Sequence, residues 1–213
     1  MSEFHDVRLA DMSDVVTITK GFPTHRAASE GDVRVMSIAA LRNQSEPRYF
    51  AGYEDIQDLK IEFGQPGEVL VSIEGGTVGE TFTVQPDVQE FVPSQQVATL
   101  RVVDPGILDP LYLGAWLSTA AAQEQLQRLA RGTGIQRIAM KELGSLVIKV
   151  PDLDTQREIG QRFIAFEAAI RSHRAVAACL EELRDAELVV SFAHSSPEPS
   201  ETSPKRKGTH HGR

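Results

Sequence analysis

The chain has 213 residues, 41% of them hydrophobic and 24% charged, and its formal net charge is -8. This length predicts one globular domain with an appendage, and the apolar runs are too short for a membrane span. The acidic balance disfavours a strongly basic, nonspecific nucleic-acid binder, although it leaves room for a local basic cleft. The lone cysteine, Cys179, cannot form an internal disulfide, and the acidic start lacks the apolar core of a secretory signal. Both features favour the cytoplasm.

The first segments alternate short apolar runs with polar loops. Residues 7–18, VRLADMSDVVTI, end in a β-branched run, and a turn-rich basic loop follows over residues 20–26. Residues 34–41 predict a strand or a short helix, and the polar side chains of residues 42–44, RNQ, come directly after it. These side chains can form bidentate hydrogen bonds with base edges, but a solvated polar loop is the more common explanation of such a segment.

The middle of the chain predicts a meander of short strands. An acidic span, residues 54–62, leads through a turn to a strand over residues 69–73, and further strands are expected at residues 81–84 and 97–103. The glycine-rich loop over residues 75–79 would let a backbone approach a partner closely. It lacks the lysine of a phosphate-binding loop and the spacing of a dinucleotide fingerprint. No nucleotide cofactor is therefore expected.

A helix is predicted after the meander. Asp109 and Pro110 have the character of an N-cap and a first-turn proline, and the helix would carry an apolar stripe from Leu113 to Leu129. Trp116 on this stripe is expected in the core. Cations near Arg131 suit the C-terminal end of a helix dipole.

The stretch from residue 131 to residue 170 combines a glycine-rich loop, a strand, Pro151 and a long amphipathic helix. Asp154 or Thr155 is the expected helix cap, because Glu158 follows at a spacing close to that of a capping box. Apolar residues then recur at spacings of four, three and four, and the pattern continues to about Val190. A helix of this length extends beyond a small domain, so its stripe requires a partner. The predicted stripe comprises Ile159, Phe163, Phe166, Ile170, Val176, Leu180 and Leu183.

The predicted fold class is therefore α+β. It comprises a domain of mixed short strands and helices over residues 1–153, an amphipathic helix over residues 154–191, and a polar, proline-rich, disordered tail over residues 192–213. His173 lies on or beside the stripe and is expected to be an interface histidine rather than a metal ligand.

No constellation for catalysis is recognisable in the sequence. It has no histidine and cysteine cluster with metal-ligand spacing and no GxSxG nucleophile elbow. The acids of residues 54–62 could hold Mg²⁺ in a nuclease, but scattered surface acids are much more common. The sequence predicts a binding protein with no metal and no cofactor.

Several segments, in the correct order, resemble the specificity subunits of type I restriction-modification systems. The loop GTGIQRI at residues 132–138 and the strand at residues 143–150 are similar to the end of their target recognition domains. PDLDTQREI, at residues 151–159, is similar to the P-P-L-x-x-Q-x-x-I signature that opens their helical region, with Asp152 in place of the second proline. The resemblance covers roughly residues 7–190.

This resemblance implies a non-catalytic subunit that recognises double-stranded DNA for methyltransferase subunits and, in full complexes, for a restriction subunit in phage defence. Full-length members carry two recognition domains, whereas this chain has room for one. Two copies are therefore expected to pair as a homodimer through a coiled coil of the stripe residues, and to read a bipartite, palindromic target.

The recognition loops, rather than the core, would contact DNA. Lys20, Arg26 and Arg137 would neutralise phosphates, while glutamines such as Gln136 would read base edges. The full predicted set is Lys20, Thr24, Arg26, Arg42, Asn43, Gln44, Gly75, Thr77, Ser94, Gln95, Gln96, Gly132, Thr133, Gly134, Gln136 and Arg137. Two alternatives stay open. One is a protein-protein adaptor of a defence complex that has lost its DNA surface; the other is a standalone enzyme. A basic cleft beside the loop at residues 132–137 favours DNA binding over the adaptor.

Overall fold

The computed structural model describes residues 3–23, 27–42, 47–50, 52 and 62–194. The predicted DNA contacts Thr24, Arg26, Asn43 and Gln44 lie outside these residues, as does the predicted tail beyond residue 194. The chain divides into two compact units, Met1–Glu167 and Ala168–Arg213. No helix in the described part of the chain combines the length and apolar character that crossing a membrane requires.

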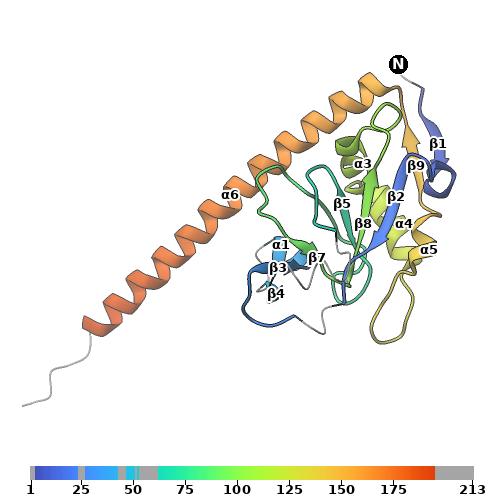
Figure 1. Cartoon of the computed structure of the whole chain (residues 1–213). Helices are drawn as coiled ribbons and strands as arrows, with labels where there is room; N and C mark the ends of the chain where they lie inside the picture. Colours follow the sequence, from blue (N-terminus) through green and yellow to red (C-terminus); the bar gives the residue numbers. More distant parts are fainter. Residues whose placement is uncertain (1–2, 24–26, 43–46, 51, 53–61, 195–213) are drawn as a thin grey trace, which may run out of the picture. The chain divides into compact units, whose positions relative to one another are not determined.

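A four-stranded antiparallel sheet forms the centre of the first unit (Figure 1). Its order is β2 (Val16–Lys20), β8 (Val97–Val102), β5 (Val69–Ser72) and β6 (Thr81–Thr83). All four residues of β5 are buried, as expected for a strand with neighbours on both sides and side chains packed on both faces. The strands expected from the meander are thus confirmed.

The described residues form two smaller sheets besides the central one. β3 (Val33–Met36) pairs with β4 (Arg48–Phe50) in antiparallel and with β7 (Val92–Pro93) in parallel orientation. The predicted strand or short helix over residues 34–41 is both in turn, because α1 (Ile38–Leu41) follows β3 directly. β1 (His5–Arg8), which leads into the 3-10 helix η1 (Leu9–Met12), pairs with β9 (Val147–Val150), so the start of the domain is joined to its end.

Helices α3 (Pro110–Leu117) and α4 (Ala120–Leu129) add apolar side chains to the same core cluster as β5 and β8, and the short α5 (Met140–Leu143) follows them. The predicted single helix is wrong here. Thr119 caps α4 by accepting a hydrogen bond from the Ala122 amide at 3.3 Å, which starts a new helix. The predicted cap at Asp109 is confirmed by a 2.9 Å bond from the Tyr112 amide. Trp116 is 8% exposed and belongs to the core, as predicted.

Helix α6 (Leu153–His194) begins one residue after Asp152. The predicted cap at Asp154 or Thr155 is wrong, because Asp152 accepts a 2.9 Å hydrogen bond from the Thr155 amide. The residue that departs from the family signature is therefore the one that caps the helix. An aspartate at this position suits a helix N-terminus both as a hydrogen-bond acceptor and as a negative charge.

The start of α6 is locked to the start of α3. Gln156 is 1% exposed; its side-chain oxygen accepts from the Asp109 amide at 2.8 Å, and its side-chain nitrogen donates to the Pro151 and Ile107 carbonyls. A Cβ on Gly160 would lie 2.9 Å from the Tyr112 amide nitrogen, so only glycine permits this approach. Burial raises the pKa of Tyr112 to about 12, and its protonated hydroxyl donates to a backbone carbonyl of β9.

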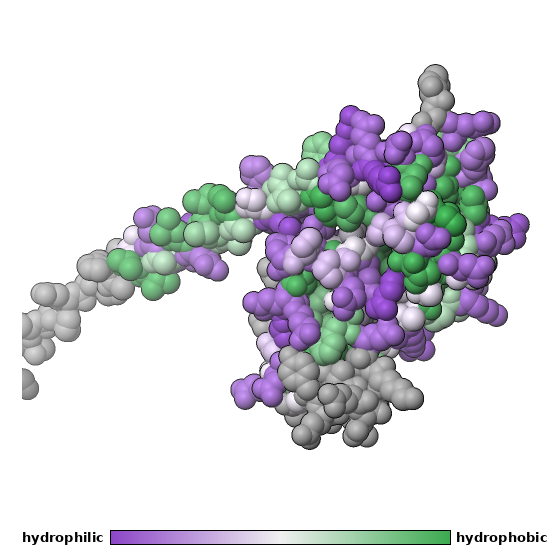
Figure 2. All heavy atoms as spheres, turned by 45° about the horizontal axis from the view of Figure 1, so that its top comes forward, coloured by the Kyte–Doolittle hydropathy of each residue, from purple (hydrophilic) through white to green (hydrophobic). Residues whose placement is uncertain are grey.

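The predicted stripe on α6 has two parts. Ile159 packs against the core of its own domain, so the first stripe residue is not free for a partner. Phe166 is 69% exposed, and the later stripe residues Ile170, Val176, Leu180 and Leu183 are exposed as well. Figure 2 shows hydrophobic residues along this helix. The α+β class is confirmed.

Candidate nucleic-acid interface

One end of the central sheet gathers loops that are distant in the sequence. Lys20 is the last residue of β2, and the next amide, of Gly21, donates to the Val97 carbonyl at the start of β8 at 2.8 Å. The Ile73 amide, just after β5, donates to the Gln96 carbonyl at 2.8 Å. The end of β2, the turn of residues 94–96 and the loop after β5 therefore meet at one edge.

A hairpin over residues 131–137 joins the same edge. Arg131 and Arg137 exchange backbone hydrogen bonds of 2.9 and 2.8 Å, which close the hairpin. At its base, the Ile138 amide donates to the Ile73 carbonyl at 2.9 Å, and the Gly75 amide donates to the Gln136 carbonyl at 3.2 Å. The hairpin is the yellow loop below α5 in Figure 1. Two of the predicted recognition loops, the glycines after β5 and residues 132–137, are thus in direct contact.

The backbone of this hairpin depends on one of its two glycines. Gly132 has φ +124, and a Cβ there would lie 2.7 Å from the Ile135 carbonyl oxygen. At Gly134, no atom lies within 4 Å of the position that a Cβ would occupy, and the backbone adopts an ordinary φ. Every residue from 131 to 137 is exposed. The hairpin therefore presents its polar side chains to solvent on a fixed base.

A shallow hollow beside the hairpin carries the charges of this edge. Lys20, Arg131 and Arg137 line it together with Glu74 and Glu142. Arg137 forms a 2.8 Å ion pair with Glu74, so part of its charge is compensated within the domain. The hollow has one more cation than carboxylates, which makes it weakly basic despite the acidic chain.

Two predicted contact residues, Thr77 and Ser94, are partly or fully buried in these loops. The Thr77 and Ser72 hydroxyl oxygens are 2.9 Å apart, which ties the glycine-rich loop to the end of β5. Ser94 is 5% exposed, and its Oγ has no hydrogen-bond partner among the described residues. In contrast, Gln96 in the same turn is exposed, and Gln95 is half-buried.

Arg42 lies away from the hollow at the hairpin. Its guanidinium forms a 2.5 Å ion pair with Glu80 and donates to the Thr81 carbonyl at 2.7 Å. It lines a different hollow, which includes Phe163 of α6. The donors of Arg42 are therefore engaged within the domain, as for a residue that holds α1 against the sheet.

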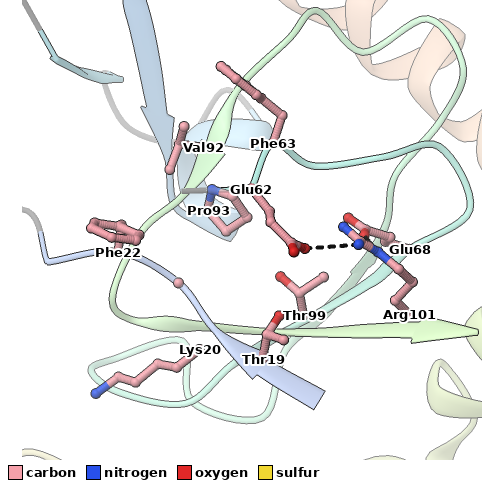
Figure 3. Close-up of a pocket in the computed structure, with 11 residues that line it drawn as sticks. Thr19, Lys20, Phe22, Glu62, Phe63, Glu68, Val92, Pro93, Thr99 and Arg101 are labelled. Atoms are coloured by element: carbon pink, nitrogen blue, oxygen red, sulfur yellow. Dashed lines mark hydrogen bonds and ion pairs between the residues drawn. The ribbon is translucent and has the colours of Figure 1, made fainter. Parts of the chain in front are cut away.

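A second hollow, of about 190 Å³, shares Lys20 with the hollow at the hairpin, and its lining residues are drawn in Figure 3. Arg101 forms ion pairs there with Glu68 at 2.5 Å and with Glu62 at 2.8 Å, and Glu68 is 3% exposed. Burial lowers the pKa of the Arg101 guanidinium, but the two carboxylates outweigh this and raise it overall. Lys20 points away from this pair. The network is built to neutralise a buried carboxylate, which the sequence did not reveal.

Sequence reasoning also missed three residues of the hairpin edge. The sequence indicates Arg131 only as a helix-end cation, and it gives no signal that Glu74 or Ile135 belongs to the site. No local sequence pattern marks them, because the hairpin is closed by backbone hydrogen bonds between residues 131 and 137, which do not depend on the arginine side chains.

The sequence profile described as the type I restriction modification DNA specificity domain matches residues 1–182, which confirms the resemblance drawn from the sequence. No curated protein matches the chain. Matching solved structures include the type I restriction-modification system S subunit from M. genitalium, with 18% identity and a TM-score of 0.65 over 91% of this chain and 47% of that chain. The HsdS subunit from Thermoanaerobacter tengcongensis matches with 20% identity and a TM-score of 0.53, over 86% of this chain and 43% of that one.

A third structure, described for complex assembly and conformational transition of the type I R-M system, is 22% identical with a TM-score of 0.55, and the match covers 89% of this chain and 45% of that one. The chain thus spans less than half the length of each of these three structures. At these identities the likeness shows the fold alone.

Proposed function

Because the chain belongs to the family of type I restriction modification DNA specificity domains, we propose that it is the sequence-specific DNA recognition subunit of such a system. The family is one of specificity domains and is not catalytic. The observation that carries the proposal is the convergence of three predicted recognition segments, at residues 20, 94–96 and 132–137, on one end of the central sheet.

In this proposal, the cations of the hollow at the hairpin contact the DNA backbone, and the side-chain amides of nearby glutamines read the bases. Lys20, Arg131 and Arg137 neutralise phosphates, which sets the register without reading sequence. Gln96 and Gln136 are exposed, and a glutamine amide can bond adenine N6 and N7 together in the major groove. The weak excess of positive charge favours a specific complex of moderate affinity over strong nonspecific binding.

We further propose that two copies pair through α6. Phe166, His173 and Leu180 recur every seven residues, as do Val176, Leu183 and Val190, three or four positions away. A sustained seven-residue repeat of two such positions is the pattern of a coiled coil. Phe166, Val176, Leu180 and Leu183 are all more than half exposed, so a second copy would bury them. A twofold pair would present two identical recognition domains to a palindromic, bipartite target and would dock on methyltransferase subunits.

The DNA proposal is tested by selecting duplexes from a random pool with the purified chain and the methyltransferase subunits that co-purify with it. The expected result is a bipartite motif with two identical halves. A motif with two unlike halves would contradict the homodimer. If no duplex is enriched while the chain still binds the methyltransferase subunits, it is a protein-protein adaptor.

The assembly proposal is tested with Phe166→Asp, measured by sedimentation. The variant is expected to be monomeric while its recognition domain stays folded, because Phe166 lies outside the domain core. Ala178→Asp is the matched control, since it places the same charge on the outer face of the helix, five positions after His173 in the repeat. A Phe166→Asp variant that sediments like the control would show that the stripe has been misassigned.

A further inference from the structure

Ile135 is the most exposed large hydrophobic residue of the described part of residues 3–165. Its side chain is 64% exposed, compared with 51% for Ile107, 49% for Val103 and 48% for Phe4. Its neighbours along the chain, Gly134 and Gln136, are exposed as well. Ile135 is also not among the residues that pack against the hydrophobic clusters of the described part of the chain.

The hairpin that carries Ile135 is firmly attached to the domain. Ile138, three residues later, is 3% exposed and belongs to the core, and its amide is bonded to the Ile73 carbonyl. The Glu74–Arg137 ion pair and the Arg131–Arg137 backbone bonds hold the two sides of the loop. Ile135 thus projects from a fixed base instead of from a loop that could fold it inward.

We propose that Ile135 is an apolar wedge that enters a DNA groove and partly unstacks a base step of the target. This inference rests on the proposed DNA recognition. Isoleucine is one of the side chains that proteins insert between base steps, and the cost of unstacking is offset by wider contact with the bent duplex. The cations of the hollow lie at the base of the same hairpin, where they would contact the phosphates beside the inserted side chain.

The wedge would add a form of specificity that the glutamines do not supply. Flexible pyrimidine–purine steps unstack more easily than stiff ones, so a wedge favours targets with such a step at one position. The open space around Gly134 lets the hairpin approach the bases without a steric block from its own backbone. Ile135 therefore becomes a specificity-determining residue through DNA deformability.

The test uses the full chain and duplexes that carry the selected site with 2-aminopurine placed at each position in turn. Wild-type protein is expected to raise the fluorescence at one step, and Ile135→Ala is expected to remove this rise and to weaken binding about tenfold, as for the loss of one buried aliphatic side chain. Ile135→Leu should restore both. Ile107→Ala removes an exposed isoleucine outside the hairpin and should change neither.

Three results would overturn the wedge. One is an undiminished fluorescence rise with Ile135→Ala. Another is that Ile135→Ala loses affinity although the wild-type chain causes no fluorescence rise at any step. If replacing a thymine of the site by deoxyuridine then causes the same loss, Ile135 contacts a thymine methyl group instead. The third is a loss of methyltransferase binding by Ile135→Ala. If the wild-type chain distinguishes no site from scrambled DNA, the proposed function fails as well.

Discussion

The junction around Gln156 and the hairpin over residues 131–137 lie close in sequence and differ in almost every physical respect. Gln156 is 1% exposed and bonds three backbone groups, whereas all seven hairpin residues are exposed. Both belong to motifs that resemble the same family. The difference teaches that the two motifs have different roles. The residues of the signature after Pro151 attach α6 to the domain, whereas the glycine-containing hairpin forms an exposed surface that a partner can contact.

Breaking the junction should have the largest effect. Gln156→Ala would leave the Asp109 amide and the Pro151 and Ile107 carbonyls without their partner, and buried groups left unsatisfied cost roughly 1–3 kcal/mol each. We expect the free energy of unfolding to fall by about 3 kcal/mol or more, measured by urea denaturation. Gln161→Ala, on the exposed side of the same helix, should change it by less than about 0.5 kcal/mol. Equal effects of the two substitutions would show that Gln156 does not hold the two helices together.

The role of the hairpin conformation can be tested by replacing each of its glycines with alanine. Gly132→Ala forces a methyl group into a position 2.7 Å from the Ile135 carbonyl at φ +124, a strain of about 1–2 kcal/mol. We expect this variant to lose discrimination between the selected site and a scrambled duplex in an equilibrium binding assay. Gly134→Ala should retain this discrimination, because the space that its Cβ would occupy is open. The opposite order would show that the hairpin conformation is not what DNA recognises.

Arg42 belongs to neither region, and its substitution tests whether the DNA interface extends as far as this residue. Its ion pair with Glu80 and its bond to the Thr81 carbonyl are partly exposed, so Arg42→Ala should lower the free energy of unfolding by only about 1 kcal/mol. Binding to the selected and scrambled duplexes should weaken equally or not at all. A loss of about 1–3 kcal/mol that is confined to the selected site would restore Arg42 as a base reader.

The smallest effect is expected at Glu74. Glu74→Gln removes the carboxylate paired with Arg137, so the guanidinium becomes free for a phosphate. We expect affinity for selected and scrambled duplexes to rise by the same factor, about threefold, with a steeper dependence of log Kd on log salt concentration. A rise on the selected site alone would instead mean that Glu74 faces a base.

Much of the fold follows from local signals in the sequence. The alternating strands, the Asp109 cap and the buried Trp116 are confirmed, because each depends on residues that are close together in the chain. The break at Thr119 was missed, since the apolar spacing runs through it and only the hydroxyl cap interrupts the helix. The expected cap at Asp154 or Thr155 is wrong by two or three residues for a similar reason: the family signature has a proline at position 152, which conceals the capping role of Asp152.

The sequence indicates which loops form the candidate site, but it does not indicate which of their residues are exposed. Lys20, Gly75 and the hairpin residues are gathered at one edge, although more than a hundred positions of sequence separate Lys20 from the hairpin. Local patterns cannot distinguish Gln136, which is exposed, from Gln156, which is buried, because burial depends on the tertiary arrangement. Arg42 shows the same limit, since its partner Glu80 is distant in the sequence.

The ratio of dissociation constants for the selected site and a scrambled duplex, at one fixed salt concentration, tests the DNA-recognition account most directly. The wild-type chain should bind the selected site far more tightly, and Gln136→Ala should reduce the ratio by a factor of about 5–150, with an unchanged unfolding curve. Equal dissociation constants for the two duplexes with the wild-type chain would contradict the account.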